Sequence, residues 1–335
     1  MLSPASADAI AIGAASPSSR AWRLGGATIF VLSAVAAAAW LLQDARKLHA
    51  RSSGARPSVA SAPWYRYLNP MAPLYDLYVH RELLHQFVRR EILGRYRGSH
   101  LGILWSLVNP LMMLGIYTFV FSTIFKARWR LEGEITQGEF AVTLFAGLIA
   151  YNVFSESVNR APTLIVSNIN YVKKVVFPLQ ILPVSAFGAA LFHGLISVVV
   201  LMLGNLVLLG SVSWRVVLLP LAAIPLVELS LGVSWLLASL GVYLRDISYA
   251  VAILTQVLIF LTPVFYRIDA VPEGLRPLVH VNPLSEVVES FRRTLVWNQT
   301  PDWTAWLGVT LVSGAIFSLG YAWFMKTRSG FADVV

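Results

Sequence analysis

The chain has 335 residues, a formal net charge of +9 and a mean hydropathy of +0.66. Charged residues make up 13% of it and hydrophobic residues 57%, whereas soluble domains carry about 25% charged residues. Several apolar runs reach the ~20 residues that a membrane-spanning helix needs. The composition therefore excludes a soluble globular domain and predicts an all-α polytopic membrane protein.

Cysteine is absent, and the positive charge lies beside the apolar runs. The sequence therefore excludes disulfides, thiol nucleophiles and cysteine-ligated metal sites, and no metal site is predicted. Basic residues that flank membrane spans favour anionic lipid headgroups and a positive-inside orientation. We accordingly predict membrane lipids, and no nucleic acid, as partners of this charge.

Residues 1–75 are predicted to form an N-terminal extension that ends in a polar linker. Within it, residues 26–42 form an apolar run at the short end of what can cross a membrane. Arg46 and Lys47 follow this run, so an extra transmembrane helix here would place the N-terminus outside. The alternative is that the chain starts at Met71, just ahead of the next predicted helix.

Residues 76–100 are predicted to form a cytoplasmic amphipathic helix. Apolar side chains recur there at three- and four-residue spacing and so share one face: Leu84, Phe87, Val88, Ile92 and Tyr96. Arginines crowd the rest of the helix, and the uncharged stretch 101–125 follows it directly. Because arginine favours the cytoplasmic side, this first span is expected to enter the membrane from the cytoplasm.

Five further spans are predicted, at residues 140–159, 179–209, 216–244, 247–265 and 304–325. Asp246 is expected to cap the start of the fifth span, because a carboxylate there can accept backbone N–H groups. The segment 267–303 is too polar to cross. It is expected to hold two short helices, around 275–280 and 283–296.

Motifs in these segments resemble one protein family. The sequence RYRGSHLGILWSLVNP begins the resemblance through Arg95, Tyr96, Arg97, Gly98, Ser99, Leu101, Gly102, Trp105 and Pro110. A basic loop and a turn continue it with Asn168, Lys173, Lys174, Phe177, Pro178, Arg245 and Asp246. Over residues 76–335 the chain resembles the permease subunits of polysaccharide-exporting ABC transporters. These are type-2 exporters of the Wzm kind, which move O-antigen, capsule or teichoic-acid chains.

The resemblance implies a type-2 ABC transporter transmembrane domain over residues 101–335, with the short helices of 267–303 re-entrant in the outer leaflet. It also implies a homodimer of permeases in the bacterial inner membrane, paired with ATP-binding subunits and moving a lipid-linked polysaccharide. The chain has no Gly-Lys dipeptide and hence no phosphate-binding loop. ATP and Mg are therefore expected on the partner subunit, with no cofactor and no enzyme activity on this chain.

Charged residues of the cytoplasmic segments are the candidates for coupling to the ATPase. The resemblance places them in the amphipathic helix and in two turns between spans: Arg89, Arg90, Arg95, Arg97, Lys173, Lys174, Arg245 and Asp246. Such turns transmit movement only if they bind differently in two states of the ATPase. The alternative is a lipid-anchored helix followed by two ordinary basic loops.

Aromatic side chains in the spans are the candidates for lining the continuous sugar channel that the resemblance implies. They are Trp105, Tyr117, Phe121, Phe260 and Tyr266. Aromatic rings stack on the C–H faces of sugars without anchoring them strongly. The alternative is lipid-facing bulk and an interfacial belt.

Glu228 lies in the middle of the fourth predicted span, where a carboxylate is costly unless it faces the helix bundle. We expect it to form a hydrogen bond to a neighbouring helix, with His193 or Asn205 as partner. The alternative is a proton or substrate site.

Two other functions remain open from the sequence. A membrane glycosyltransferase or polymerase acting on polyprenyl-linked sugars would need an acid in an outer loop, where Glu132, Glu134 and Glu139 lie. A type-2 exporter of a small drug or lipid would keep the same architecture and carry a different cargo.

Overall fold

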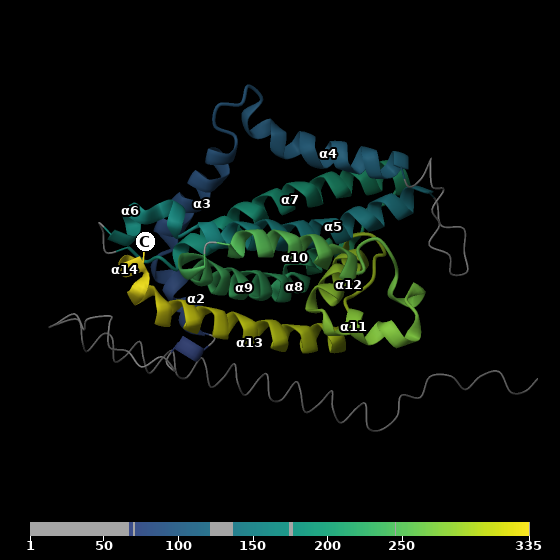
Figure 1. Cartoon of the computed structure of the whole chain (residues 1–335). Helices are drawn as coiled ribbons and strands as arrows, with labels where there is room; N and C mark the ends of the chain where they lie inside the picture. The colour runs from purple at the N-terminus through teal and green to yellow at the C-terminus, as the bar shows by residue number, and fades with distance from the viewer. Residues whose placement is uncertain (1–66, 70, 121–136, 174–176, 245, 335) are drawn as a thin grey trace, which may run out of the picture. The chain divides into compact units, whose positions relative to one another are not determined.

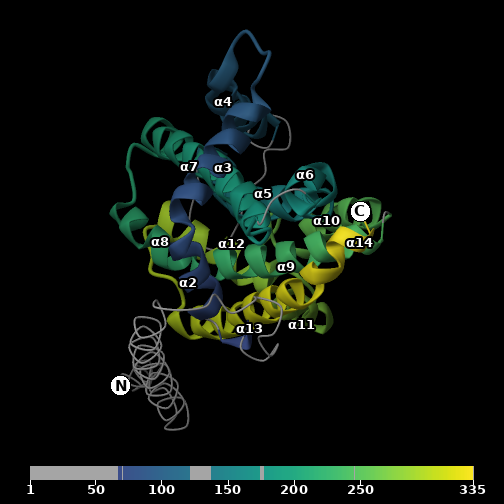
Figure 2. The same ribbon diagram turned by 90° about the vertical axis from the view of Figure 1, so that its left-hand side faces the viewer.

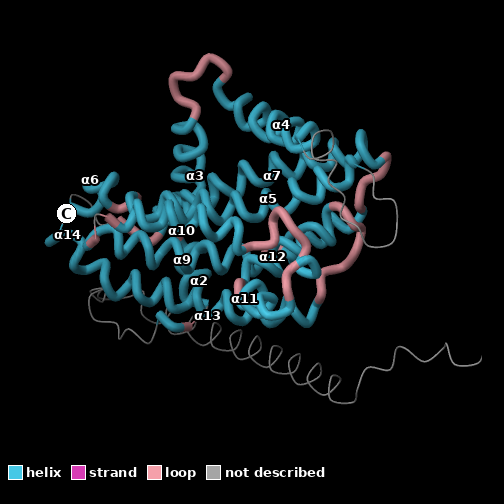
Figure 3. The backbone as a smooth tube through the Cα atoms, turned by 45° about the vertical axis from the view of Figure 1, so that its right-hand side comes forward, coloured by secondary structure: helices cyan, strands magenta, loops and turns pink. Residues whose placement is uncertain are grey.

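A computed structural model describes residues 67–69, 71–120, 137–173, 177–244 and 246–334. The chain divides into the units Met1–Ser61 and Ala62–Val335, and every described element belongs to the second unit. In this described part all regular elements are helices (Figures 1 and 3), which confirms the predicted all-α class. The predicted extra helix at 26–42 lies outside the described residues.

Five helical stretches in the described part are long and apolar enough to cross a membrane. They are Gly102–Val120, Gly138–Thr163, Ile181–Leu209, Trp214–Tyr243 and Trp303–Val334. The fifth predicted span, 247–265, differs, because helix α10 covers only Ile247–Leu261. At 1.5 Å per residue such a helix spans about 22 Å, less than the ~30 Å of a hydrocarbon core. It ends where Thr262 takes an extended backbone (φ −93°, ψ 135°) ahead of Pro263.

The core of the unit is built around helix α5 (Gln137–Arg160), which is buried along most of its length. Helix α7 (Ile181–Leu209) packs on one side of it and helix α9 (Ile224–Tyr243) on another. Helix α13 (Trp303–Thr327) packs mainly on α9. Figures 1 and 2 show α13 on one side of this bundle and helix α4 (Trp105–Tyr117) on the opposite side.

Helices α9 and α13 meet through glycine. A Cβ atom added at Gly320 would lie 2.1 Å from the carbonyl oxygen of Gly232, and one at Gly232 would lie 2.6 Å from that of Ile316. The two backbones are therefore in direct contact, as is common where membrane helices associate through small residues.

The predicted amphipathic helix of 76–100 is divided in two. Helix α2 (Met71–Val79) ends before His80, and helix α3 (Arg81–Arg95) follows and packs on α7. Phe87 of α3 is buried. Its ring centroid lies 5.5 Å from that of Tyr171 and 5.1 Å from that of Phe177. This aromatic cluster ties α3 to the short helix α6 (Ile169–Lys173).

The chain turns sharply between α3 and α4 (Figure 1). Gly98 there has φ +84° and Gly102 has φ +52°, values that L side chains rarely adopt. The 3₁₀ turn η3 (Gly102–Leu104) then leads into α4.

The predicted continuous span 216–244 is broken at its start. It consists of the 3₁₀ turn η7 (Trp214–Leu218), helix α8 (Leu219–Ala222) and then α9, with prolines at 220 and 225 at the helix starts. Because proline lacks an N–H group, it is favoured at the first turn of a new helix rather than inside a long one.

Between α10 and α13 the chain forms helices α11 (Arg276–Val281) and α12 (Pro283–Leu295). They lie at the end of the bundle opposite α3, α6 and the C-terminal helix α14 (Phe331–Val334), as Figures 1 and 3 show.

Asp246 does not cap α10 with its side chain, which corrects the expectation from the sequence. It occupies the N-cap position, but its backbone is near-helical (φ −82°, ψ −5°) and its carboxylate makes no capping hydrogen bond. An N-cap side chain reaches the first amides from an extended backbone, which Asp246 lacks.

A polar cavity between the first three long helices

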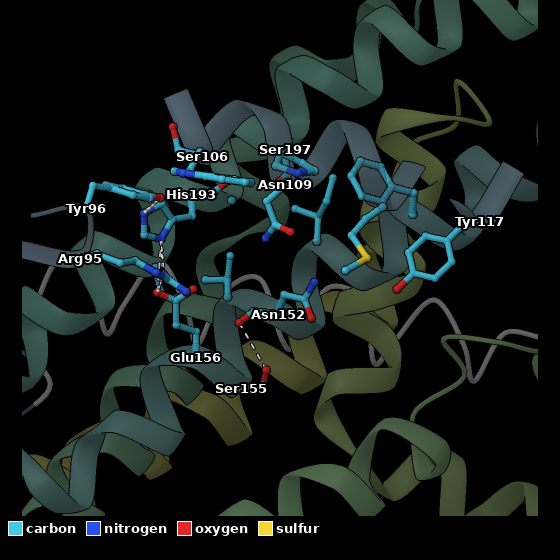
Figure 4. A pocket seen from close by; sticks show the side chains of 18 residues that line it. Arg95, Tyr96, Ser106, Asn109, Tyr117, Asn152, Ser155, Glu156, His193 and Ser197 are labelled. Carbon is cyan, nitrogen blue, oxygen red and sulfur yellow. Dashed lines mark hydrogen bonds and ion pairs between the residues drawn. The ribbon is translucent and has the colours of Figure 1, made fainter. Parts of the chain in front are cut away.

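A cavity of about 680 Å³ opens between the end of α3 and helices α4, α5 and α7 (Figure 4). It runs along α4, from Trp105 near the end of α3 to Tyr117 at the other end of the helix. Its polar lining comes from all four helices: Arg95, Tyr96, Ser106, Asn109, Asn152, Ser155, Glu156, His193 and Ser197. Such a set of polar groups inside apolar spans is costly unless it pairs internally or faces water and cargo.

Four of these side chains form one network. Arg95 makes an ion pair and hydrogen bond with Glu156, and its Nη1 lies 2.8 Å from Nδ1 of His193. The same Nδ1 lies 3.2 Å from Oε1 of Glu156. The hydroxyl of Tyr96 lies 3.0 Å from the other ring nitrogen, Nε2. The charges of Arg95 and Glu156 thus compensate each other at the wall of the cavity.

Local packing explains why these groups meet. A Cβ atom added at Gly194 would lie 2.5 Å from the side chain of Val153, so α5 and α7 approach closely there and bring Glu156 opposite His193. Arg95 and Tyr96 arrive from the last turn of α3, just before the chain turns at Gly98. Burial raises the pKa of Tyr96, which keeps its phenol protonated and able to donate to His193.

Two amides face the cavity beyond this network. Asn109 of α4 and Asn152 of α5 are exposed, and within the described part of the chain neither side-chain amide has a hydrogen-bond partner. Each amide offers donors and an acceptor. They are therefore available to water or to a polar molecule in the cavity.

The rest of the lining is aromatic and apolar. Trp105 is 40% exposed, and Tyr117 and Phe145 line the cavity with it, together with Pro110 and Met113. Amides and hydroxyls that hydrogen-bond, beside rings that stack, suit a polyhydroxylated molecule.

The cavity brings together three of the residues that the sequence singled out, Arg95, Trp105 and Tyr117. Phe260 and Tyr266 do not line it. The Tyr266 hydroxyl donates to the Phe260 carbonyl at 2.9 Å near the far end of α10. Phe121 lies outside the described residues.

The candidate coupling residues occupy several places. Arg90 lies 4.2 Å from the Phe87 ring and donates to the Tyr171 hydroxyl at 3.0 Å. Arg89 lines a separate apolar groove of about 510 Å³ against α7. Arg97 and Lys173 are exposed, while Lys174 and Arg245 lie outside the described residues.

Sequence reasoning missed Glu156, Asn109 and Asn152, and it gave His193 a different partner. The signal was present for two of them, since Asn152 and Glu156 stand four residues apart in the predicted span 140–159 and so share a helix face. The expected partner of Glu228 was wrong. His193 belongs to the cavity network, and Asn205 donates to the Leu295 carbonyl at 2.8 Å.

Comparison with known proteins identifies the family. The ABC-2 type transporter family matches residues 82–296, a stretch that contains every residue lining the cavity and the whole connection to α12. The chain belongs to this family. It is a transport permease with several membrane-spanning helices.

Curated relatives align with most of the chain. It is 28% identical to the O-antigen export system permease protein RfbA of Myxococcus xanthus, over 78% of this chain and 98% of the relative. It is 29% identical to RfbA of Klebsiella pneumoniae, with the same two coverages. The polysialic acid transport protein KpsM of Escherichia coli is 27% identical over 69% of this chain and 85% of its own length.

Proposed function

We propose that this chain is the membrane subunit of an ATP-driven exporter that moves a lipid-linked polysaccharide across the bacterial inner membrane. Two copies pair with separate ATP-binding subunits that carry ATP and Mg. The names of the relatives support the saccharide cargo. The observation that carries the proposal is the cavity, because its amides, hydroxyls and aromatic rings match the two faces of a sugar.

The lining of the cavity suits the passage of a polysaccharide rather than its tight binding. Asn109 and Asn152 exchange hydrogen bonds with successive hydroxyls, while Trp105 and Tyr117 offer rings on which sugar faces slide. The Arg95–Glu156 pair neutralises its own charges, so the wall neither traps an anionic sugar nor repels it. A polymer that must advance by many units requires weak contacts of this kind.

The amphipathic helix α3 links this cavity to the cytoplasmic surface. Its Arg90 and Phe87 contact Tyr171 of α6, while its last residue, Arg95, lines the cavity. Movement of an ATPase bound at α3 and α6 would therefore reach the cavity wall through one rigid helix. This arrangement supports α3 and α6 as the coupling surface.

Deletion of the gene in its own host tests the proposal against a glycosyltransferase. An exporter that is lost leaves completed, lipid-linked polysaccharide inside the cell, whereas a lost polymerase leaves no polymer at all. We expect internal polymer on lipid extraction and gel analysis, with none at the surface. Normal surface polysaccharide in the deletion strain would contradict the saccharide cargo and favour export of a small drug or lipid.

A further inference from the structure

A second polar pocket, of about 600 Å³, lies at the opposite end of the bundle from α3 and α6. Its lining is drawn from the loop after α10, from α11 and α12, and from the connection into α13. The side chains that matter for its chemistry are Arg267, Glu286, Glu289, Arg293, Trp297 and Gln299. Nothing in the polar cavity described above contributes to it.

The two faces of α12 explain why this pocket is polar. One face is apolar and buried in the bundle through Leu284, Val287, Val288, Phe291 and Leu295. Glu286, Glu289 and Arg293 follow at three- and four-residue spacing and so occupy the other face. The helix therefore turns its charged side chains toward the pocket while its apolar side anchors it.

The walls are tied to the long helices. Asn282, at the start of α12, donates to the Thr262 hydroxyl at 2.9 Å. Near its end, Arg292 donates to the Val264 carbonyl at 2.5 Å and to the Thr143 carbonyl at 3.3 Å. The Ser213 hydroxyl donates to the Thr294 carbonyl at 2.6 Å. The pocket is thus preformed, which lowers the cost of binding a ligand.

The charges of the lining narrow the ligand class. Glu289 lies 3.7 Å from Arg293, and Asp302 accepts from the amides of Thr304 and Ala305 at the start of α13. The pocket lining mixes acidic and basic side chains. It therefore lacks the excess of one charge sign that would favour a simple anion or a metal cation. Carboxylates accept from hydroxyl groups and guanidinium groups donate to them, beside an indole and an amide. These are the complements of an uncharged, polyhydroxylated molecule.

We propose that this pocket is a saccharide-binding site, which holds one or two neutral sugar units of the exported chain at the outer end of the protein. Its volume lies within the ~300–1,000 Å³ of ligand pockets in general. The inference rests on the proposed function for its cargo. The pocket gives the protein a second contact with the polysaccharide, and this contact would oppose backward sliding of the polysaccharide between ATPase cycles.

The test uses the full transporter purified with its ATPase from the host. The probe is a set of short oligosaccharides released by mild acid from the host's own surface polysaccharide, and binding is measured by saturation-transfer NMR and titration. Trp297→Ala and Gln299→Ala should each weaken binding about tenfold. Gln299 is exposed and its backbone N–H, not its side chain, bonds to the Arg293 carbonyl, so this variant should fold.

Trp214→Ala is the matched control, since Trp214 is 67% exposed and lies outside the pocket. It should bind like the wild type. The site would be overturned if all three variants bound the oligosaccharides with the affinity of the wild type. It would also be overturned if a wild-type complex that still exports polysaccharide bound none of them. Either result would leave the proposed function intact. A complex that neither binds nor exports saccharide would contradict both the binding site and the proposed function.

Discussion

At the scale of single residues, the network at the cavity wall joins parts of the chain that the sequence keeps far apart. Arg95 and Glu156 are separated by 61 positions, and Arg95 and His193 by 98. Motif resemblance drew attention to Arg95, but no local pattern in the sequence indicates its partners. Ion pairs of this kind depend on helix packing and cannot be read from one sequence.

A double-mutant cycle tests this network. Arg95→Ala or Glu156→Ala alone leaves a partly buried charge without its partner, and hydrogen bonds to charged groups contribute ~1.5–3 kcal/mol. We expect each single variant to reduce export roughly tenfold, and the double variant to be no worse than the poorer single one. Radiolabelled sugar appearing at the cell surface measures export. If the fold reductions of the two single variants multiplied in the double variant, the two side chains would act independently.

Glu286 gives the pocket beside α12 a pH dependence. Burial raises its pKa from 4.5 to about 7, partly opposed by Arg293 and by the Ser290 hydroxyl, while Glu289 and Asp302 add to the increase. The folded protein thus keeps a proton that the unfolded chain releases between these values. This contribution to the free energy of unfolding is fully present below pH 4.5 and is lost as pH rises through 7.

Glu286→Gln should therefore raise Tm at pH 8 and leave it nearly unchanged at pH 4.5. The gain is on the order of 1–2 kcal/mol, because water at the pocket mouth screens the full effect of the pKa shift. Differential scanning fluorimetry in detergent measures it. Glu273→Gln is the control, since the Glu273 side chain is 90% exposed. Identical pH profiles for wild type and Glu286→Gln would be inconsistent with a partly buried carboxyl whose pKa is raised.

At the scale of elements, long apolar runs predicted most helices well. Runs such as 179–209 and 304–325 correspond to α7 (Ile181–Leu209) and α13 (Trp303–Thr327). The sequence failed where proline and short-range geometry intervene, at the broken start of α9 and at the early end of α10. Hydropathy is averaged over a window of residues and does not register such breaks. Membrane helices tolerate the breaks where neighbouring helices satisfy the freed backbone groups.

The contact between α9 and α13 makes a prediction at this scale. In Gly320→Ala the new methyl group meets the Gly232 backbone, which has no flexible side chain to move, so the helices must separate. We expect a loss of about 1–3 kcal/mol or more in stability, seen as a lower Tm in detergent.

Gly308→Ala, on the same helix, is the control. An added Cβ there meets nothing within 4 Å, so it should be neutral or stabilise α13 by up to about 1 kcal/mol. A Gly320→Ala protein as stable as the control would show that the two backbones are not in contact.

At the scale of the whole molecule, two separate polar sites lie in one helix bundle. The cavity is lined by the end of α3 and by α4, α5 and α7, and the pocket by α11, α12 and the loops beside them. The resemblance predicted the family and the transport role, and the family match bears these out. Neither site was visible from the sequence as a unit, since each gathers residues from at least three separate segments.

The most direct test asks whether the cargo touches the cavity wall. A photo-reactive benzoylphenylalanine replaces Asn152 in the full transporter, and the complex is illuminated during ATP-driven export in membrane vesicles. Leu319, 59% exposed on α13 at the far side of the bundle, carries the same probe as control.

We predict that polysaccharide becomes covalently attached at position 152 only while ATP is hydrolysed, and not at position 319. Carbohydrate-specific staining of the purified chain detects it. A vesicle preparation that exports polysaccharide normally, yet gives no attachment at 152 or in a matching probe at Asn109, would contradict the cavity as the path of the sugar chain.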